Sequence, residues 1–595
     1  MDQPDTLVTG ATGFMGRWLA AELLSAGRPV AVTVRGGPAR AVDLRAWLRA
    51  HDVSDQRLTV VAADVTRPGL ALAPQDETRL DSVRDVFNTA GVYRFRLGRD
   101  EARRVNVDGA VNVLRWAAAR PRLRRLVHIS GYRVGTAEPH SEHDLAALYR
   151  RLGAYEASKR EGDAAVRRAA AEQGVPLTVV NPATVIGHSA TGESGQYLGL
   201  AGLVERLWSG RLPALPGSRH TYVPVVTADH LARFLAAVPE HDRGPFRAHW
   251  VLDDDTPELP ELVALLARHL GLRAPRVLLP AGLVRRLPRA LTGAEPESLT
   301  FMSEDRYDTS SAGALAEAAG LAHPPVREAL RRWAGRLVAD RFGRAGPALK
   351  GGFELVAGSA TYLAGDRLSP DYVLLHGLPL DAESWQGVLP GLDGAALVAD
   401  LPGLGRSAPS AADPAAWLTA LLAPVRTRPV LVAHSAGAAP ALRYAHAHPE
   451  RLAGLVLVSP YFLQRRPPWH LRAALLVGPL LRTASAARLA RALLGPGAAA
   501  GPALESAAAQ VRRPGVARRT ARRLAQAQRQ AERAELRALA ATCPVPVRVI
   551  AGEHDPLVGD ALDVPVTIVK GTGHHPQLTH PAPVAAAANG GFDYD

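Results

Sequence analysis

Three polar residues in the N-terminal half, Ser130, Tyr155 and Lys159, have the types and spacing that proton transfer to a carbonyl oxygen requires. Tyr155 and Lys159 are four residues apart in YEASK, so on a helix they share one face, where the ammonium group lowers the pKa of the phenol. A tyrosine tuned in this way can protonate a carbonyl oxygen, to which Ser130 can also donate a hydrogen bond. Asn106, in RRVNVDGAVNVL, is placed to order a proton-relaying water. The alternative is a surface helix that carries Tyr and Lys by accident, which fits poorly in a chain with only three lysines.

The segment TGATGFMG has the glycine spacing of a phosphate-binding turn. It follows an apolar strand and precedes a helical run over residues 17–25. Backbone amides in such a turn hold a pyrophosphate, and the helix N-terminus adds a partial positive charge. The cofactor-binding residues predicted here are Gly10, Thr12, Gly13, Phe14, Met15 and Gly16.

Residues at the ends of the next strands indicate which dinucleotide binds. Arg35 occupies the position where a carboxylate would bind the ribose of NAD, and a guanidinium suits a 2′-phosphate instead. The sequence therefore favours NADP(H) over NAD(H). Asp64 and Val65 follow the third predicted strand and Ala90 follows the fourth, both places where a doubly wound sheet meets its nucleotide. For each of these three residues alone, an ordinary strand-end turn is an equal alternative.

A second group of chemically competent residues lies in the C-terminal half. Ser435 in LVAHSAGAAPAL stands between an apolar strand and a helical run, the setting of a nucleophilic serine on a sharp turn. Ala433 replaces the first glycine of the usual GxSxG pattern, which we interpret as a variant. Asp555 and His574 each follow a later strand, giving the order Ser, Asp, His expected of a hydrolytic triad.

Other residues near these motifs compete for roles or complete them. His575 is a rival base and Glu553 a rival acid; the GxGH spacing favours His574, and the place in the motif favours Asp555. The backbone amides of Leu378, after His376-Gly377, and of Ala436 are the predicted oxyanion hole.

The elements that must position these residues alternate between short apolar runs and amphipathic helices, which predicts α/β architecture. We predict a domain over residues 1–340, a linker over 341–352, and a second α/β domain over 353–590 with a helical cap at about 461–541 and a loose tail at 591–595. Residues 188 to about 335 are expected to form a substrate-covering lobe. The predicted strands are 6–8, 30–34, 58–62, 86–87, 126–129 and 177–180 in the first domain, and 372–375, 396–398, 430–432, 455–458 and 547–550 in the second.

Composition limits the partners. The net charge of +13 and pI near 10.3 come almost entirely from arginine spread along the chain, so a nucleic-acid partner is not favoured. Cys543 is the only cysteine, which excludes an intramolecular disulfide and a cysteine metal cluster, and no metal site is predicted.

No signal peptide or membrane-spanning stretch is evident, so we expect a soluble, cytoplasmic protein. The Leu/Ala and Arg stripe of the cap would suit a membrane surface, but a packed amphipathic helix is favoured. The oligomeric state is not predicted.

Residues 5 to 335 resemble the extended short-chain dehydrogenase/reductase family, and HISGYRVG, YEASK and NPATVIG look closest to its acyl-thioester and fatty-acyl reductase branch. The resemblance implies a Rossmann-type doubly wound parallel sheet with a small substrate lobe. It also implies that Ser130, Tyr155 and Lys159 are catalytic, with Lys159 also contacting the cofactor. Pro182 and Val185 would flank the nicotinamide.

Residues 353 to 590 resemble the α/β-hydrolase family through HGLPLDAESW, DLPGLGRS, AHSAG, GEHD and GTGHHP. A serine at the elbow implies hydrolysis of an ester, thioester or lactone. The leading hypothesis is a bifunctional enzyme that reduces a ketone, aldehyde or acyl thioester with NADPH and hydrolyses a related acyl bond. Two alternatives are epimerase or dehydratase chemistry in the first domain, and a catalytically silent binding module in one half.

Overall fold

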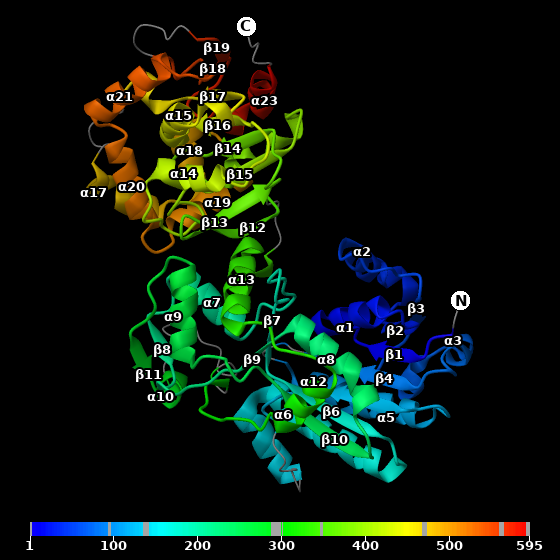
Figure 1. The fold of residues 1–595 in the computed structure, drawn as a ribbon. Helices are drawn as coiled ribbons and strands as arrows, with labels where there is room; N and C mark the ends of the chain where they lie inside the picture. The colour runs from blue at the N-terminus through cyan, green and yellow to red at the C-terminus, as the bar shows by residue number, and fades with distance from the viewer. Residues whose placement is uncertain are drawn as a thin grey trace. The chain divides into compact units, whose positions relative to one another are not determined.

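The computed structural model describes residues 3–92, 94, 97–134, 142–286, 299, 301–344, 349–466, 473–557 and 564–590 of the chain. It divides into two compact units (Figure 1). The first comprises Met1–Gly202, Pro213–Leu265 and Pro275–Ala334, and the second comprises Leu203–Leu212, Leu266–Ala274 and Gly335–Asp595. Two short segments of the predicted first domain, 203–212 and 266–274, are therefore grouped with the second unit. A single domain boundary in the sequence cannot describe this division.

The first unit is built on a seven-stranded sheet in the order β10-β6-β5-β4-β1-β2-β3, and all of its neighbouring strands are parallel. Parallel strands need crossover connections, and helices supply them. The strands are β1 (Thr6–Thr9), β2 (Val30–Val34), β3 (Leu58–Ala62), β4 (Asp85–Asn88), β5 (Arg125–Ile129), β6 (Leu177–Pro182) and β10 (Phe246–Val251). The helices before β10 are α1 (Phe14–Ser25), α2 (Val42–Ala50), α3 (Pro74–Arg79), α4 (Arg99–Arg103), α5 (Gly109–Ala118), α6 (Glu142–Gln173), α7 (Leu200–Trp208) and α8 (Ala228–His241).

Helices cover both faces of this sheet because its strands are buried on both sides. Val8 packs with α1, α2, α8 and α12 (Ser310–Ala318), whereas the preceding residue Leu7 packs with α5 and α6 on the opposite face. The smaller elements form two two-stranded sheets and further helices. They are β7 (Thr184–Ile186), β8 (Ala214–Pro216), β9 (Val225–Thr227), β11 (Val277–Leu279), α9 (Leu259–His269), α10 (Ala281–Arg286), α12 (Ser310–Ala318) and α13 (Val326–Ala339).

The second unit contains an eight-stranded sheet in the order β12-β13-β15-β14-β16-β17-β18-β19. Pairs β12·β13 and β13·β15 are antiparallel, and the remaining pairs are parallel. The strands are β12 (Gly351–Val356), β13 (Ser359–Gly365), β14 (Tyr372–Leu375), β15 (Ala396–Ala399), β16 (Val430–His434), β17 (Gly454–Val458), β18 (Val547–Gly552) and β19 (Val566–Val569). The helices outside the cap are α14 (Pro414–Leu422), α15 (Ala438–Ala447), α22 (Pro576–Thr579) and α23 (Pro581–Asn589).

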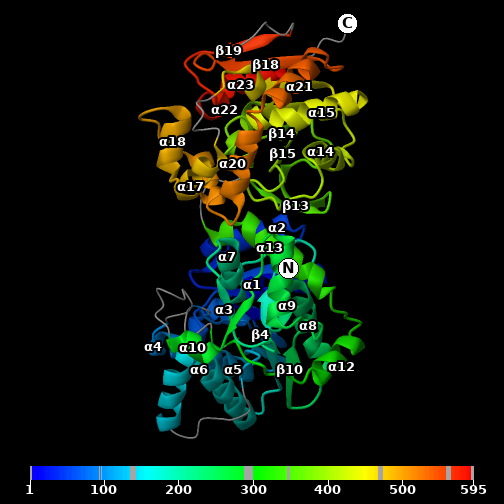
Figure 2. The same cartoon turned by 90° about the vertical axis from the view of Figure 1, so that its left-hand side faces the viewer.

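The cap is a run of helices between β17 and β18. Its helices are α17 (Ala474–Thr483), α18 (Ala486–Leu494), α19 (Pro502–Val511), α20 (Val516–Gln526) and α21 (Gln530–Ala541). Figure 2 shows α17, α18 and α20 together at one side of this unit, whereas α21 lies beside α15. Residues 467–472 of the predicted cap and the predicted tail 591–595 lie outside the described residues.

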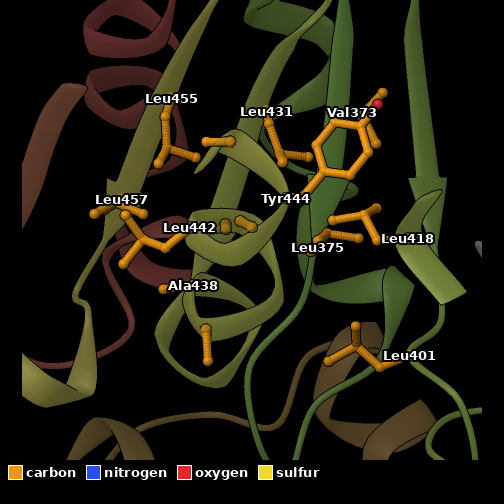
Figure 3. Close-up of a cluster of buried hydrophobic side chains, with 14 of the residues drawn as sticks. Val373, Leu375, Leu401, Leu418, Leu431, Ala438, Leu442, Tyr444, Leu455 and Leu457 are labelled. Atoms are coloured by element: carbon orange, nitrogen blue, oxygen red, sulfur yellow. The ribbon is translucent and has the colours of Figure 1, made fainter. Parts of the chain in front are cut away.

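The core of the second unit lies on both faces of its sheet. On one face, Val373, Leu431 and Leu455 from three strands pack against Leu442 and Tyr444 of α15 (Figure 3). The alternating strand residues face the other way and pack with Trp385 and α23. This double burial explains the continuous apolar runs in the sequence.

The predicted fold class is confirmed, and the observed strands overlap all eleven predicted ones. In the two large sheets, β10, β12 and β13 were not predicted, and β19 was expected only as a strand before His574, without bounds; the short strands β7, β8, β9 and β11 were also not predicted. Phe246, Leu355 and Ile568, on β10, β12 and β19, are substantially exposed, and these three strands lie at the edges of their sheets, where apolar runs are weaker. The predicted linker 341–352 overlaps the start of β12 at Gly351.

Candidate active sites

The glycine turn after β1 is shaped so closely that side chains do not fit. Gly10 has φ +74°, and a Cβ there would lie 2.7 Å from the backbone nitrogen of Ala90. A Cβ on Gly16 would lie 2.3 Å from the carbonyl oxygen of Gly10, and one on Gly13 would lie 3.1 Å from it. The turn leads into α1, with Thr12 exposed at its outer side. The bare backbone at a helix N-terminus fits a dinucleotide pyrophosphate.

Arg35 at the end of β2 and Asp64 after β3 interact through their charges. Arg35 is exposed, and its charge acts on the carboxylate of Asp64. Burial raises the pKa of Asp64, but hydrogen bonds from Thr66 (3.0 Å from the backbone nitrogen and 2.8 Å from Oγ1) and the charge of Arg35 hold it below its usual value. The carbonyl oxygen of Val65 accepts a hydrogen bond from Asn112. Asp64 is therefore an anion that stabilises its own turn.

A cavity of about 210 Å³ lies in the first unit, beside the glycine turn. It is lined by six of the predicted catalytic and cofactor-binding residues: Met15, Ser130, Tyr155, Lys159, Pro182 and Val185. The rest of its wall is mainly apolar and includes Tyr132, Leu198, Leu200, Phe301, Met302 and Trp333. The structure thus brings the predicted serine, tyrosine and lysine to one apolar chamber.

Lys159, which lines this cavity, is held in place by the backbone. Its Nζ donates a hydrogen bond to the carbonyl oxygen of Ile129 at 3.2 Å. Burial lowers the pKa of Lys159 to about 8, and the carboxyl group of Asp163 partly opposes this. A Cβ added to Gly91 would lie 3.3 Å from Nζ, so the glycine leaves the room that the ammonium group occupies.

Asn106 lies in a π-helical turn over Arg104–Asp108, a local departure that is frequent at functional sites. Its Oδ1 accepts a hydrogen bond from the backbone nitrogen of Val92 at 3.0 Å, and its Nδ2 donates to Oγ of Ser158 at 2.9 Å. A Cβ on Gly162 would lie 2.2 Å from the carbonyl oxygen of Asn106. Both ends of the amide are occupied, so Asn106 ties α6 to the segment after β4.

Several residues around Tyr155 were not predicted from the sequence. Gly153, with φ +81°, interrupts α6 two residues before the tyrosine. Asp163 is buried one turn beyond Lys159 and forms an ion pair with Arg167 at 2.7 Å. Burial raises the pKa of Asp163. The spacing of Asp163 after Lys159 was visible in the sequence, but its burial was not.

In the second unit, Ser435 sits on a sharp turn between β16 and α15. Its φ is +47°, a left-handed conformation that a non-glycine residue adopts at a cost and that is frequent at active sites. Gly377 provides space for it, since a Cβ on Gly377 would lie 2.8 Å from Cβ of Ser435, and Gly437 lets the turn pack against β14, since a Cβ there would lie 2.9 Å from the carbonyl oxygen of Leu375. The variant Ala433 is fully buried in β16 without disturbing the strand.

Ser435, His574 and Asp555 form a continuous hydrogen-bonded chain. Oγ of Ser435 lies 2.9 Å from Nε2 of His574, and Nδ1 of the same imidazole lies 2.6 Å from Oδ2 of Asp555. Nε2 of His434 lies 2.9 Å from the carbonyl oxygen of His574. Burial lowers the pKa of His434 to about 3, so this neighbouring ring is neutral. The arrangement can move a proton from the serine hydroxyl to the imidazole.

The two rival residues lie elsewhere. His575 is buried, and burial lowers its pKa well below the usual value. Glu553 is exposed and accepts a hydrogen bond from the backbone nitrogen of Gly571 at 2.8 Å. Neither residue takes part in the hydrogen-bonded chain described above.

Gln464 is a residue of this site that the sequence analysis missed. It is buried, its Nε2 donates a hydrogen bond to Oδ2 of Asp555, and it pairs with Leu557 in an isolated bridge. Arg533 of α21 donates to the carbonyl oxygen of Gln464. Asp555 is thus oriented by Gln464, which precedes the cap helices in the sequence whereas Asp555 follows them. No local motif indicates this contact.

The predicted oxyanion residues flank Ser435. Ala436 lies in the turn Ser435–Gly437, and Leu378 directly follows Gly377. The adjoining loop is tied to the cap, because Oγ of Ser506 donates to Oδ2 of Asp381 at 2.7 Å. Burial and the nearby Asp400 carboxyl raise the pKa of Asp381 to about 6.

The chain matches two protein families over separate ranges. Residues 8–235 match the NAD-binding family described as Male sterility protein, and residues 372–587 match the alpha/beta hydrolase family. NRPS-like oxidoreductase fscA from Fusarium equiseti is 29% identical over 198 residues, which cover 31% of this chain and 19% of that protein.

Two further relatives each match less than half of this chain. Isonitrile lipopeptide synthase from Streptomyces coeruleorubidus is 31% identical over 265 residues, covering 41% of this chain and 17% of the synthase. Tetraketide alpha-pyrone reductase 1 from Arabidopsis thaliana is 28% identical over 290 residues, covering 45% of this chain and 82% of the reductase. The chain therefore spans less than a fifth of the fungal and bacterial relatives. Within the described residues, no helix is long and apolar enough to cross a bilayer.

Proposed function

We propose that two domains of this chain are both catalytic: the part that matches the NAD-binding family described as Male sterility protein, and the part that matches the alpha/beta hydrolase family. The first reduces a ketone, aldehyde or acyl thioester with NADPH, and the second hydrolyses an ester, thioester or lactone with Ser435 as nucleophile. Two observations support this proposal: one cavity gathers Ser130, Tyr155 and Lys159, and a hydrogen-bonded chain links Ser435 to Asp555.

In the reductase, the cofactor supplies hydride, and the protein's own residues manage the proton and the geometry. Tyr155 donates its phenolic proton to the carbonyl oxygen while Ser130 hydrogen-bonds the same oxygen. Lys159, fixed by the carbonyl oxygen of Ile129, places a positive charge beneath them. The apolar wall excludes water and suits a substrate with an apolar acyl portion. Small-molecule substrates of this kind are the proposed partners.

In the hydrolase, His574 takes the proton of Ser435 as the hydroxyl oxygen attacks the acyl carbon, and Asp555 stabilises the imidazolium. The backbone amides of Leu378 and Ala436 are proposed to hold the oxyanion. His574 then returns the proton to the leaving group, and water releases the acyl group from Ser435 by the reverse sequence. Gln464 keeps Asp555 in position.

The proposal is tested on the full chain with two assays. NADPH oxidation is followed over a panel of acyl-CoA thioesters, aldehydes and ketones, and hydrolysis is followed with p-nitrophenyl esters. We expect stoichiometric NADPH consumption with at least one carbonyl class, and labelling of Ser435 by a fluorophosphonate probe. Conversion of a substrate without net NADPH consumption would instead indicate an epimerase or dehydratase. A probe that leaves Ser435 unlabelled would indicate a silent hydrolase domain.

Replacement of Arg35 is expected to change cofactor preference. Arg35→Ser removes a guanidinium that can pair with the 2′-phosphate, so the ratio of kcat/KM for NADPH to that for NADH should fall by about tenfold or more. Arg247→Ser is a matched control, because Arg247 is exposed on β10 at the opposite edge of the sheet. An unchanged ratio in Arg35→Ser would refute the role of Arg35.

The reductase is expected to lose activity as the pH rises through about 8. Burial lowers the pKa of Lys159 to about 8, so its ammonium group is present below that pH and is lost above it. The pH profile of kcat/KM for carbonyl reduction measures this. Lys159→Arg keeps the charge at higher pH and should move the alkaline limb upward, whether or not its overall rate is lower. A limb that stays at the same pH in Lys159→Arg would show that another group causes it.

A further inference from the structure

Helix α17 of the cap presents an apolar face that the other described residues of the chain leave uncovered. Leu475 is 91% exposed, Leu480 is 66% exposed and Leu476 is 50% exposed. Leu476 and Leu480 are four residues apart and Leu475 adjoins them, so the three side chains lie on one side of the helix. Exposing three neighbouring leucines on one short helix is costly unless something covers them.

The opposite side of α17 is already used for packing. Val477 is buried, and Gly478 faces α20, because a Cβ added there would be in ordinary van der Waals contact, 3.8 Å, with Cβ of Ala521. Figures 1 and 2 both show α17 beside α20. Helix α17 therefore has one packed face, toward α20, and a separate apolar face that points outward.

The arginines of α20 divide into an inner and an outer set. Arg519 and Arg523 point inward and donate hydrogen bonds at 2.8 Å to the carbonyl oxygens of Gly403 and Pro402. Arg518 and Arg522, each one residue earlier and four residues apart, are exposed on the outer side. Arg519 and Arg523 thus attach the cap to the loop after β15, whereas Arg518 and Arg522 leave positive charge at the surface.

The surface around the leucines is strongly positive. Arg482 at the end of α17 is exposed, as are Arg488 and Arg491 in the next helix. Residues 473–541 contain twelve arginines and three glutamates, with no lysine or aspartate. Projecting leucines beside outward cations are the combination with which interfacial helices bind anionic lipid surfaces.

We propose that the cap binds an anionic phospholipid surface through α17, with Leu475, Leu476 and Leu480 entering the headgroup layer and the outer arginines pairing with lipid phosphates. A second copy of the chain fits this face less well, because each copy carries a formal net charge of +13 and this region contributes strongly to it. A nucleic acid would use the arginines and would leave the leucines exposed to water.

The test is flotation of the full chain with vesicles of phosphatidylcholine alone and of phosphatidylcholine with phosphatidylglycerol. We expect binding only to the anionic vesicles, weakening as salt rises because exposed charges are screened. The double variant Leu475→Asp/Leu480→Asp should lower the bound fraction by about tenfold or more. Leu355→Asp is the matched control, because Leu355 on β12 is 72% exposed outside the cap.

Hydrolysis of a water-soluble p-nitrophenyl ester verifies that the variants are folded, since none of these leucines belongs to the proposed machinery. Failure of the natural chain to float with anionic vesicles would overturn the proposal. Equal flotation of the Asp double variant would overturn it as well. Analytical ultracentrifugation tests whether a second copy of the chain covers this face instead. If the natural chain is a dimer that does not bind lipid, and the Leu475→Asp/Leu480→Asp variant is a monomer, the face is a contact between copies.

Discussion

Ser435→Ala is expected to lower kcat for p-nitrophenyl ester hydrolysis by at least about a thousandfold, because only the serine hydroxyl can form the covalent acyl bond. The natural Oγ is already 2.9 Å from Nε2 of His574, so alanine removes the nucleophile while leaving the base and acid in place. Ester turnover is measured on the full chain, with NADPH-dependent reduction followed in the same preparation. Reduction should be unchanged, since Ser435 lies in the other unit.

Two comparisons separate loss of the nucleophile from a general disturbance. Ser369→Ala removes a hydroxyl from an exposed turn of the same unit and should leave hydrolysis unaffected. His574→Ala should match the loss in Ser435→Ala, because residues of a triad act as a unit, whereas His575→Gln should retain a substantial rate if it remains folded. Ester turnover by Ser435→Ala at a tenth of the natural rate or more would exclude serine catalysis.

The parallel framework of both units could be predicted because buried strands leave a plain signature. Runs such as 30–34 and 430–432 are apolar on both faces, and both fell within observed strands. The outer strand β12 has an exposed leucine and a mixed pattern, so composition alone did not reveal it, and β19, with exposed valine and isoleucine, was expected before His574 only without bounds. The assignment of residues 203–212 and 266–274 to the second compact unit depends on tertiary packing and has no local signal.

Functional residues on the ends of those strands were predictable for the same reason. Ser130 follows β5 and Ser435 follows β16, so strand prediction located them in space as well as in sequence. Gln464 was not predictable, because it reaches Asp555 across 91 residues of chain that include the cap. The break at Gly153 was also missed, since a glycine inside a helical pattern is usually tolerated without a change of direction.

Tyr155→Phe is expected to lower kcat for carbonyl reduction by about a hundredfold to ten-thousandfold, the range that a positioned general acid contributes. Phenylalanine retains the ring that lines the cavity and removes only the phenolic proton. The dissociation constant for NADPH, measured by fluorescence, should therefore change by less than about threefold. A large loss in kcat with an intact cofactor affinity would place Tyr155 at the chemical step and not in the fold.

Tyr149→Phe is the matched comparison, because Tyr149 lies on the same helix α6 and its hydroxyl donates to Glu161 at 2.7 Å, away from the cavity lining. It loses one hydroxyl of the same kind and should keep most of the reductase activity. If Tyr155→Phe retained more than a tenth of the natural kcat, the proton would have to come from another donor. Ser130 is the other predicted catalytic hydroxyl that lines the cavity. A further loss of reduction on adding Ser130→Ala to Tyr155→Phe would then identify Ser130 as the proton donor.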